Sequence, residues 1–163
     1  MGKSELFLSI PQILNTALLI VLLTVEGIWD WKTRRIRMDA VLLCAAAGIC
    51  LRIADRMTVC SYRYDGPSLL ASFLPGAVLL LLAVLGRGIG SGDAALFLTA
   101  GLLWGQETAE LAFFTFLLAA AVGLILHFFR HLGWKDSVPM APFMLISGVG
   151  IVIAQLLQAA VPE

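Results

Sequence analysis

Apolar residues gather in six runs that alternate with short polar stretches along the chain. A helix that crosses the hydrocarbon core of a bilayer needs about 20 mostly apolar residues. The pattern therefore predicts one all-α domain over residues 1–163, a polytopic membrane protein built as a bundle of six transmembrane helices. The expected spans are residues 9–29, 39–54, 68–86, 94–105, 109–129 and 139–160.

The composition supports a membrane protein. Of the 163 residues, 60% are hydrophobic and 13% are charged, and the mean hydropathy of +0.95 exceeds what a soluble core of this size requires. The formal net charge is zero, so no overall field favours nucleic acid as a partner. The lipid bilayer is the expected partner, and the oligomeric state stays open.

Basic residues are distributed unequally between the two sides of the predicted bundle. One side carries seven of them, Lys32, Arg34, Arg35, Arg37, Arg87, Arg130 and Lys135. The other side carries four, Lys3, Arg52, Arg56 and Arg63. The positive-inside rule makes the first side cytoplasmic and places both termini outside.

Two aspartates stand at the ends of apolar runs on the cytoplasmic side. Asp93 closes a glycine-rich break, residues 87–93, and Asp30 ends the first run. Ionisable groups at membrane depth are costly and are functional candidates by default. Because both acids fall on one face, a bundle can bring them together. Two such carboxyl groups share a proton and act as acid and base, as in aspartic proteases, without a metal or organic cofactor.

Gly90 and Gly92 stand on either side of Ser91, directly before Asp93. Without side chains they permit a bend and let an extended peptide approach the backbone closely. We therefore expect a strand-like edge that pairs with the main chain of a substrate, with Gly90 and Gly92 as substrate-binding residues.

Each acid also has a simpler interpretation. Asp93 is a favoured residue for the N-cap of the fourth helix, and Asp30 can pair with Arg34, four residues on. Glu26, one turn before Asp30, is either a rival second acid or a polar contact inside the bundle. Binding of protons or cations by the two aspartates would instead make the chain a small transporter or channel.

No metal site is expected among the cysteines and histidines. Cys44, Cys50 and Cys60 form no C-x-x-C pair. The first two are interpreted as packing residues, and the state of Cys60 stays open. His127 and His131 are four residues apart but lack a third ligand nearby, which favours an interfacial role.

Tryptophans and small residues point to ordinary membrane-helix features. Tryptophans near the expected helix ends are typical of an interfacial aromatic belt: Trp29, Trp31, Trp104 and Trp134. Small residues that permit close helix packing lie in the second, fifth and sixth runs: Ala45, Ala46, Ala47, Gly48, Ala119, Ala120, Ala121, Gly123, Ser147, Gly148 and Gly150.

Three motifs resemble those of one family. Residues 90–93, Gly-Ser-Gly-Asp, match the Gly-x-Gly-Asp motif of membrane aspartyl proteases. Residues 30–36 resemble the first catalytic motif of the type IV prepilin leader peptidases, an Asp at a helix end followed by basic residues and an Ile. Residues 138–143 resemble the Pro-x-x-Pro-Phe entry to that family's last helix. The motifs occur in the family's order and extend over nearly the whole chain.

The resemblance implies a membrane aspartic endopeptidase in the bacterial plasma membrane. Such an enzyme removes the leader peptide from type IV pilin-like precursors, its protein substrate, at the cytoplasmic face. Asp30 and Asp93 would form the catalytic dyad and no cofactor would be needed.

Two features depart from the family. Members usually continue the first motif with Pro-Asn, where this chain has Arg37 and Met38. Larger members carry a cytoplasmic insertion with paired C-x-x-C zinc motifs and N-methyltransferase activity. The corresponding loop, residues 30–38, is short and lacks cysteine, which predicts peptidase chemistry alone. A related protease with another substrate and an inactive homologue acting in pilus or secretion assembly are the alternatives.

The orientation is testable by single-cysteine labelling in intact cells, in a chain from which the native cysteines have been removed. A membrane-impermeant reagent should modify Asp65→Cys, which lies outside, and spare Arg35→Cys, which lies in the cytoplasm. The reverse labelling pattern contradicts the orientation.

Overall fold

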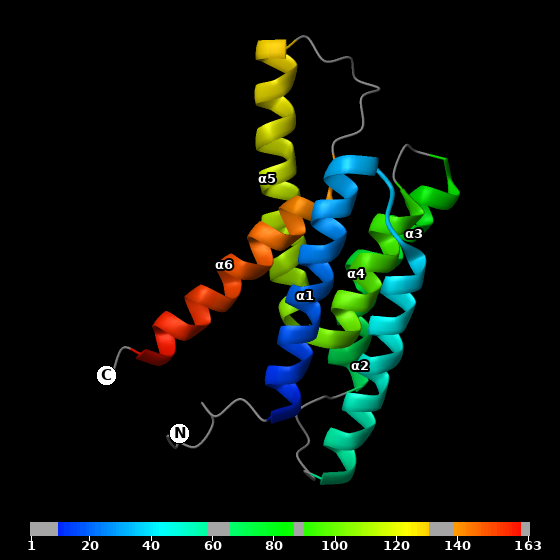
Figure 1. Cartoon of the computed structure of the whole chain (residues 1–163), viewed down its shortest axis with the longest axis vertical. Helices are drawn as coiled ribbons and strands as arrows, with labels where there is room; N and C mark the ends of the chain where they lie inside the picture. The colour runs from blue at the N-terminus through cyan, green and yellow to red at the C-terminus, as the bar shows by residue number, and fades with distance from the viewer. Residues whose placement is uncertain (1–9, 59–65, 87–89, 131–138, 161–163) are drawn as a thin grey trace.

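Six helices make up the part of the chain that the structure, a computed structural model, describes: residues 10–58, 66–86, 90–130 and 139–160. The helices are α1 (Ile10–Thr33), α2 (Met38–Thr58), α3 (Gly66–Val84), α4 (Ser91–Trp104), α5 (Glu107–Arg130) and α6 (Ala141–Ala160) (Figure 1). These described residues include no strand. The predicted all-α fold and the six helical runs are confirmed.

Backbone geometry marks the ends of the helices that matter for the site. Helix α1 ends where Arg34 takes the left-handed conformation, with φ of 52°, and its N–H donates to the carbonyl of Asp30 at 2.8 Å. Helix α4 ends at Gly105, whose φ of 72° suits a residue without Cβ and whose N–H donates to the carbonyl of Gly101 at 3.1 Å. Short connections follow both helices, so each next helix turns back along the bundle.

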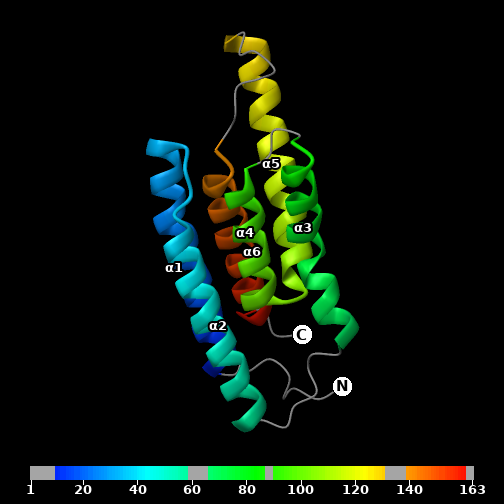
Figure 2. The same ribbon diagram turned by 90° about the vertical axis from the view of Figure 1, so that its right-hand side faces the viewer.

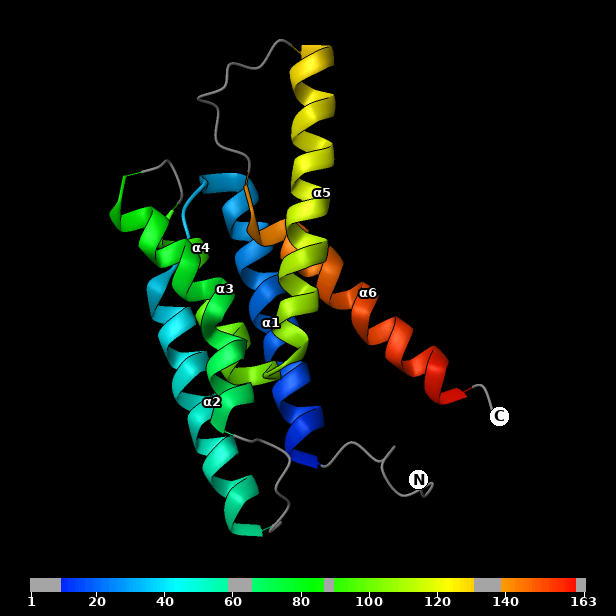
Figure 3. The ribbon, with the colours of Figure 1, turned by 180° about the vertical axis from the view of Figure 1, so that it is seen from behind.

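Helix α4 is the centre of the bundle. It contacts α1, α2, α3 and α5, and in Figure 2 it lies between the pair α1 and α2 and the pair α3 and α5. Two helices reach outward: α5 extends beyond the rest of the bundle at one end, and α6 runs obliquely away from it (Figures 1 and 3). The buried core includes Leu19, Leu22, Leu23, Leu96, Phe97, Ala100, Leu111 and Met144.

The closest helix packing joins α3 to α4, through two glycines that the sequence analysis did not single out. A Cβ added at Gly101 would lie 2.5 Å from the backbone oxygen of Ser72, and one at Gly76 would lie 2.7 Å from the backbone nitrogen of Leu98. In contrast, an added Cβ at Gly123 or Gly150 meets nothing within 4 Å, so the expected close packing is wrong at these two positions. A small residue permits close packing only where a neighbour is present.

Three helices are long and apolar enough to cross a membrane within the described residues, at Gln12–Thr33, Glu107–Phe128 and Ala141–Gln158. The prediction of six transmembrane helices is therefore only partly supported. Helix α4 has 14 residues, which at about 1.5 Å per residue is shorter than the roughly 30 Å of a hydrocarbon core. The apolar part of α3, Leu70–Val84, is also short.

Trp104 is not an interfacial residue. Its side chain is 6% exposed, and its indole Nε1–H donates to Thr16 Oγ1 at 3.2 Å. Trp31 is 70% exposed, as expected for the aromatic belt, and Trp134 lies outside the described residues. Trp104 is buried because the central position of α4 places the end of this helix inside the bundle.

The close α3 to α4 contact predicts opposite effects for two glycine substitutions. Gly101→Ala should lower the stability by about 1–3 kcal/mol, because the new Cβ must displace the backbone at Ser72. The matched control, Gly123→Ala, should leave the stability unchanged or raise it by about 0.5–1 kcal/mol, since helix propensity is gained without a clash. Unfolding in detergent measures both, and equal stability of the two variants contradicts the packing argument.

Candidate active site

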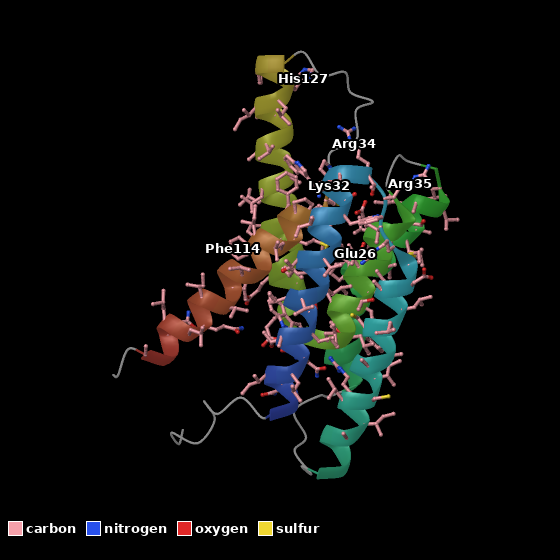
Figure 4. All side chains as sticks on the ribbon, viewed as in Figure 1. Glu26, Lys32, Arg34, Arg35, Phe114 and His127 are labelled. Atoms are coloured by element: carbon pink, nitrogen blue, oxygen red, sulfur yellow. The ribbon has the colours of Figure 1, made fainter. Side chains whose placement is uncertain are left out.

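The predicted acids lie at the same end of the bundle. Asp30 belongs to the last turn of α1 and Asp93 to the first turn of α4, and α6 begins at this end too (Figure 1). In Figure 4, Lys32, Arg34 and Arg35 gather at this end of α1, with Glu26 just inside it. The structure therefore brings together three elements that the sequence separates.

Asp30 is anchored by the start of α6. Its side chain is 5% exposed, and Oδ2 accepts a hydrogen bond from the backbone N–H of Ala141 at 3.3 Å. Ala141 is the first residue of α6, and the N-terminus of a helix stabilises negative charge. This contact joins the segment that resembles the Pro-x-x-Pro-Phe motif to Asp30. No ion pair joins Asp30 and Arg34 among the described residues, but the charge of Arg34 acts on the Asp30 carboxyl group, and the backbone N–H of Arg34 donates to the carbonyl of Asp30 at 2.8 Å.

Asp93 is the third residue of α4, and the N-cap of this helix is Gly90, with φ of −71° and ψ of 134°. The N-cap interpretation of Asp93 is therefore wrong. Burial and, to a smaller extent, the negative charge of Asp30 raise the pKa of Asp93 to about 6, although a hydrogen bond from the backbone of Gly90 partly opposes both. The effect of Asp30 places the two carboxyl groups within electrostatic range of each other. Near neutral pH, a pair of this kind can hold one proton between them.

The glycine motif has a different geometry from the one expected. Ser91, Gly92 and Asp93 are helical, so the strand-like edge is wrong for these residues, and only Gly90 is extended. Gly92 does not have a positive φ. A Cβ added at Gly92 would lie 2.8 Å from the Cβ of Ile36. The space beside Gly92 is therefore occupied by the connection between α1 and α2. A Cβ at Gly90 would lie 3.1 Å from Asp93 Oδ2.

Glu26 is a polar contact inside the bundle, as one of the two interpretations predicted. Its side chain is fully buried, and both of its oxygens contact Arg37. The backbone N–H of Arg37 donates to Oε2 at 2.9 Å and the guanidinium Nε lies 3.4 Å from Oε1. In the sequence, Arg37 stands out only as a basic residue and as a departure from the motif that residues 30–36 resemble.

No metal centre is evident in the described part of the chain, where no three His, Cys, Asp or Glu residues lie close enough to share an ion. Cys44 and Cys50 are free thiols on α2, whereas Cys60 and His131 lie outside the described residues.

The model of the type IV leader peptidase family matches residues 17–128. The chain belongs to the type IV leader peptidase family. The matched region contains both Asp30 and Asp93 and ends before α6, so the contact from Ala141 to Asp30 is an observation independent of the match. Comparison with curated proteins and with solved structures gave no match. Membership in this family favours a protease over the transporter alternative.

The contact of Gly92 with Ile36 predicts that Gly92→Ala lowers cleavage activity by about 10-fold to 100-fold, because displacement of the reacting groups by about 1 Å is costly. Ser91→Ala is the matched control: Ser91 is exposed in the same helical turn and should keep near wild-type activity. Turnover of a candidate prepilin by purified variants measures the effect, with thermal unfolding to confirm folding. Wild-type turnover by a stable Gly92→Ala variant contradicts the argument.

Proposed function

We propose that the protein is a membrane aspartic endopeptidase that cleaves the leader peptide of type IV pilin-like precursors at the cytoplasmic face of the bacterial plasma membrane. The observation that carries the proposal is the convergence of Asp30 and Asp93 at one end of the bundle, where the charge of one raises the pKa of the other. Family membership supports a leader-peptidase-like protease in general. The two acids at one end of the bundle support an aspartic mechanism.

The two environments suggest different roles in peptide hydrolysis. Asp30 receives an N–H from the start of α6, which favours its charged form as the base. Asp93 lies in the more proton-retaining position and serves as the acid. Asp30 removes a proton from water as the water oxygen bonds to the scissile carbonyl carbon, and Asp93 donates its proton to the carbonyl oxygen. Return of the proton to Asp93 and donation from Asp30 to the amide nitrogen then break the C–N bond.

The packing of the bundle also suggests how the short helix α4 can be accommodated in a membrane. Helix α4 is surrounded by α1, α2, α3 and α5, so it does not have to span the bilayer by itself. We propose that all six helices lie in the membrane, with the dyad end towards the cytoplasm. The excess of basic residues on that side supports this orientation. Gly90, which is exposed and extended beside Asp93, is the proposed contact for the substrate main chain. Gly92 supports it from the first turn of α4, where it packs against Ile36.

Replacement of either member of the dyad should abolish cleavage. Asp30→Asn and Asp93→Asn are each expected to lower turnover by at least about 10²-fold, since each removes one partner in proton transfer. The turnover of the double variant should be no lower than that of the less active single variant, because the two aspartates act as one unit. Asp39→Asn, which changes an exposed acid at the start of α2, is the matched control and should cleave normally.

Cleavage is scored as leader removal on a gel, first by co-expression with a candidate prepilin and then with purified protein in detergent. Thermal unfolding shows whether each variant is folded. Near-full activity in a folded Asp30→Asn or Asp93→Asn variant removes that residue from the dyad.

A further inference from the structure

Glu26 lies one turn before Asp30 on α1 and is buried completely. A carboxylate taken out of water without a partner costs several kcal/mol or loses its charge. The structure provides this carboxylate with a partner from outside α1, and that partner comes from the connection to α2.

Arg37 contacts Glu26 with both its main chain and its side chain. The backbone N–H donates to Oε2 at 2.9 Å, and the guanidinium Nε lies 3.4 Å from Oε1. The guanidinium carbon is also 4.9 Å from the centre of the Trp29 ring, within the range of a cation–π contact. A proline at position 37 has no N–H and could not make the shorter of the two hydrogen bonds. The pair therefore depends on the residue that departs from the family motif.

The segment held by this pair touches α4 next to the dyad. Residue 36 directly precedes Arg37, and the Cβ of Ile36 lies where a Cβ on Gly92 would clash, at 2.8 Å. Gly92 in turn is adjacent to Asp93. One end of the connection is tied to Asp30 through the hydrogen bond from the N–H of Arg34, and the other end is tied to Glu26.

We propose that Glu26 and Arg37 are positioning residues, which hold the connection between α1 and α2 against α4 and thereby set the placement of Asp93 relative to Asp30. The negative charge of Glu26 acts on Asp30, and the guanidinium of Arg37, 3.4 Å from Glu26 Oε1, opposes that charge. This inference rests on the proposed proteolytic function. Glu26 itself takes no part in proton transfer.

Steady-state cleavage of a prepilin by purified variants in detergent tests the proposal. Glu26→Gln and Arg37→Gln should each lower kcat by about 10-fold, with KM within about twofold of wild type, because placement of the reacting groups changes and substrate binding does not. Both Arg37→Gln and Arg37→Lys keep the backbone N–H, but only Arg37→Lys keeps the charge, and it should recover most of kcat. Arg35→Gln removes the same charge from an exposed neighbour and is the matched control.

The pH profile of kcat separates positioning next to the dyad from a merely structural role. Among the described residues, the charged or titratable groups that interact with Glu26 are Asp30 on α1, Arg37 on the connection and Cys44 on α2. Arg34 acts on Asp30, and Asp30 acts on Asp93 of α4. Glu26→Gln leaves a positive charge near the dyad, so the acid limb should move to lower pH. Arg37→Gln leaves a negative charge and should move it to higher pH. Arg35→Gln should leave the profile in place.

The outcomes are distinguishable from failure of the proposed function. A wild-type protein that cleaves no prepilin contradicts the function, and the positioning role falls with it. If the wild type cleaves and folded Glu26→Gln and Arg37→Gln match it in kcat and pH profile, the positioning role alone is overturned. Lower thermal stability with unchanged kcat and pH profile per folded enzyme also overturns it, since the pair would then stabilise the fold only.

Discussion

The cost of placing carboxyl groups inside an apolar bundle governs the arrangement at one end of this protein. Three acids meet there, and each is accommodated differently. Glu26 forms an ion pair with Arg37, and Asp30 accepts a hydrogen bond from the N–H of Ala141 at the start of α6. The pKa of Asp93 is raised to about 6, so this carboxyl group keeps its proton to a higher pH than an ordinary aspartate. The first two arrangements bring the α1–α2 connection and the start of α6 against α1. The contacts that stabilise these buried acids therefore also bring the parts of the candidate site together.

Helix α4 carries this arrangement because it is short and central. Its first turn presents Asp93, and its last turn is fixed by close packing on α3. At that far end, the carbonyl of Gly101 accepts hydrogen bonds from Ser72 Oγ at 3.2 Å and from Arg52 Nη2 at 3.4 Å. Backbone contact at Gly76 and Gly101 leaves little freedom for α4 to slide along α3. The position of Asp93 is therefore determined by packing along the whole helix.

The chain belongs to the type IV leader peptidase family, and position 37 is one of the places where it departs from the motif that it resembles. Where relatives have a proline to shape the turn after the first motif, this chain uses a residue with an N–H and a positive charge. Glu26 accepts a hydrogen bond from that N–H and forms an ion pair with that charge. The departure from the motif is thus accompanied by a specific contact, which argues against reading it as decay of an inactive homologue.

Much of the fold and part of the site could be predicted from local pattern. Runs of apolar residues reveal helices because each helix satisfies its own backbone, and Asp30 and Asp93 stand out because charge is rare in such runs. Their placement on one face follows from counting helices. The sequence also suggested that Gly92 makes a close approach, but it assigned that approach to a substrate.

Only the tertiary structure decided which groups meet. Ile36 against Gly92, Ala141 against Asp30, and Trp104 against Thr16 join residues that no local pattern connects. The burial of Trp104, the helical state of Gly92 and the pairing of Glu26 with the backbone of Arg37 all depend on how α1, α4 and α6 pack. Hydrophobic periodicity predicts which residues form a helix, because helix formation depends on residues within about one turn of each other. The partner of a buried polar group depends on the neighbouring helix, and that neighbour is set by the packing of the whole bundle.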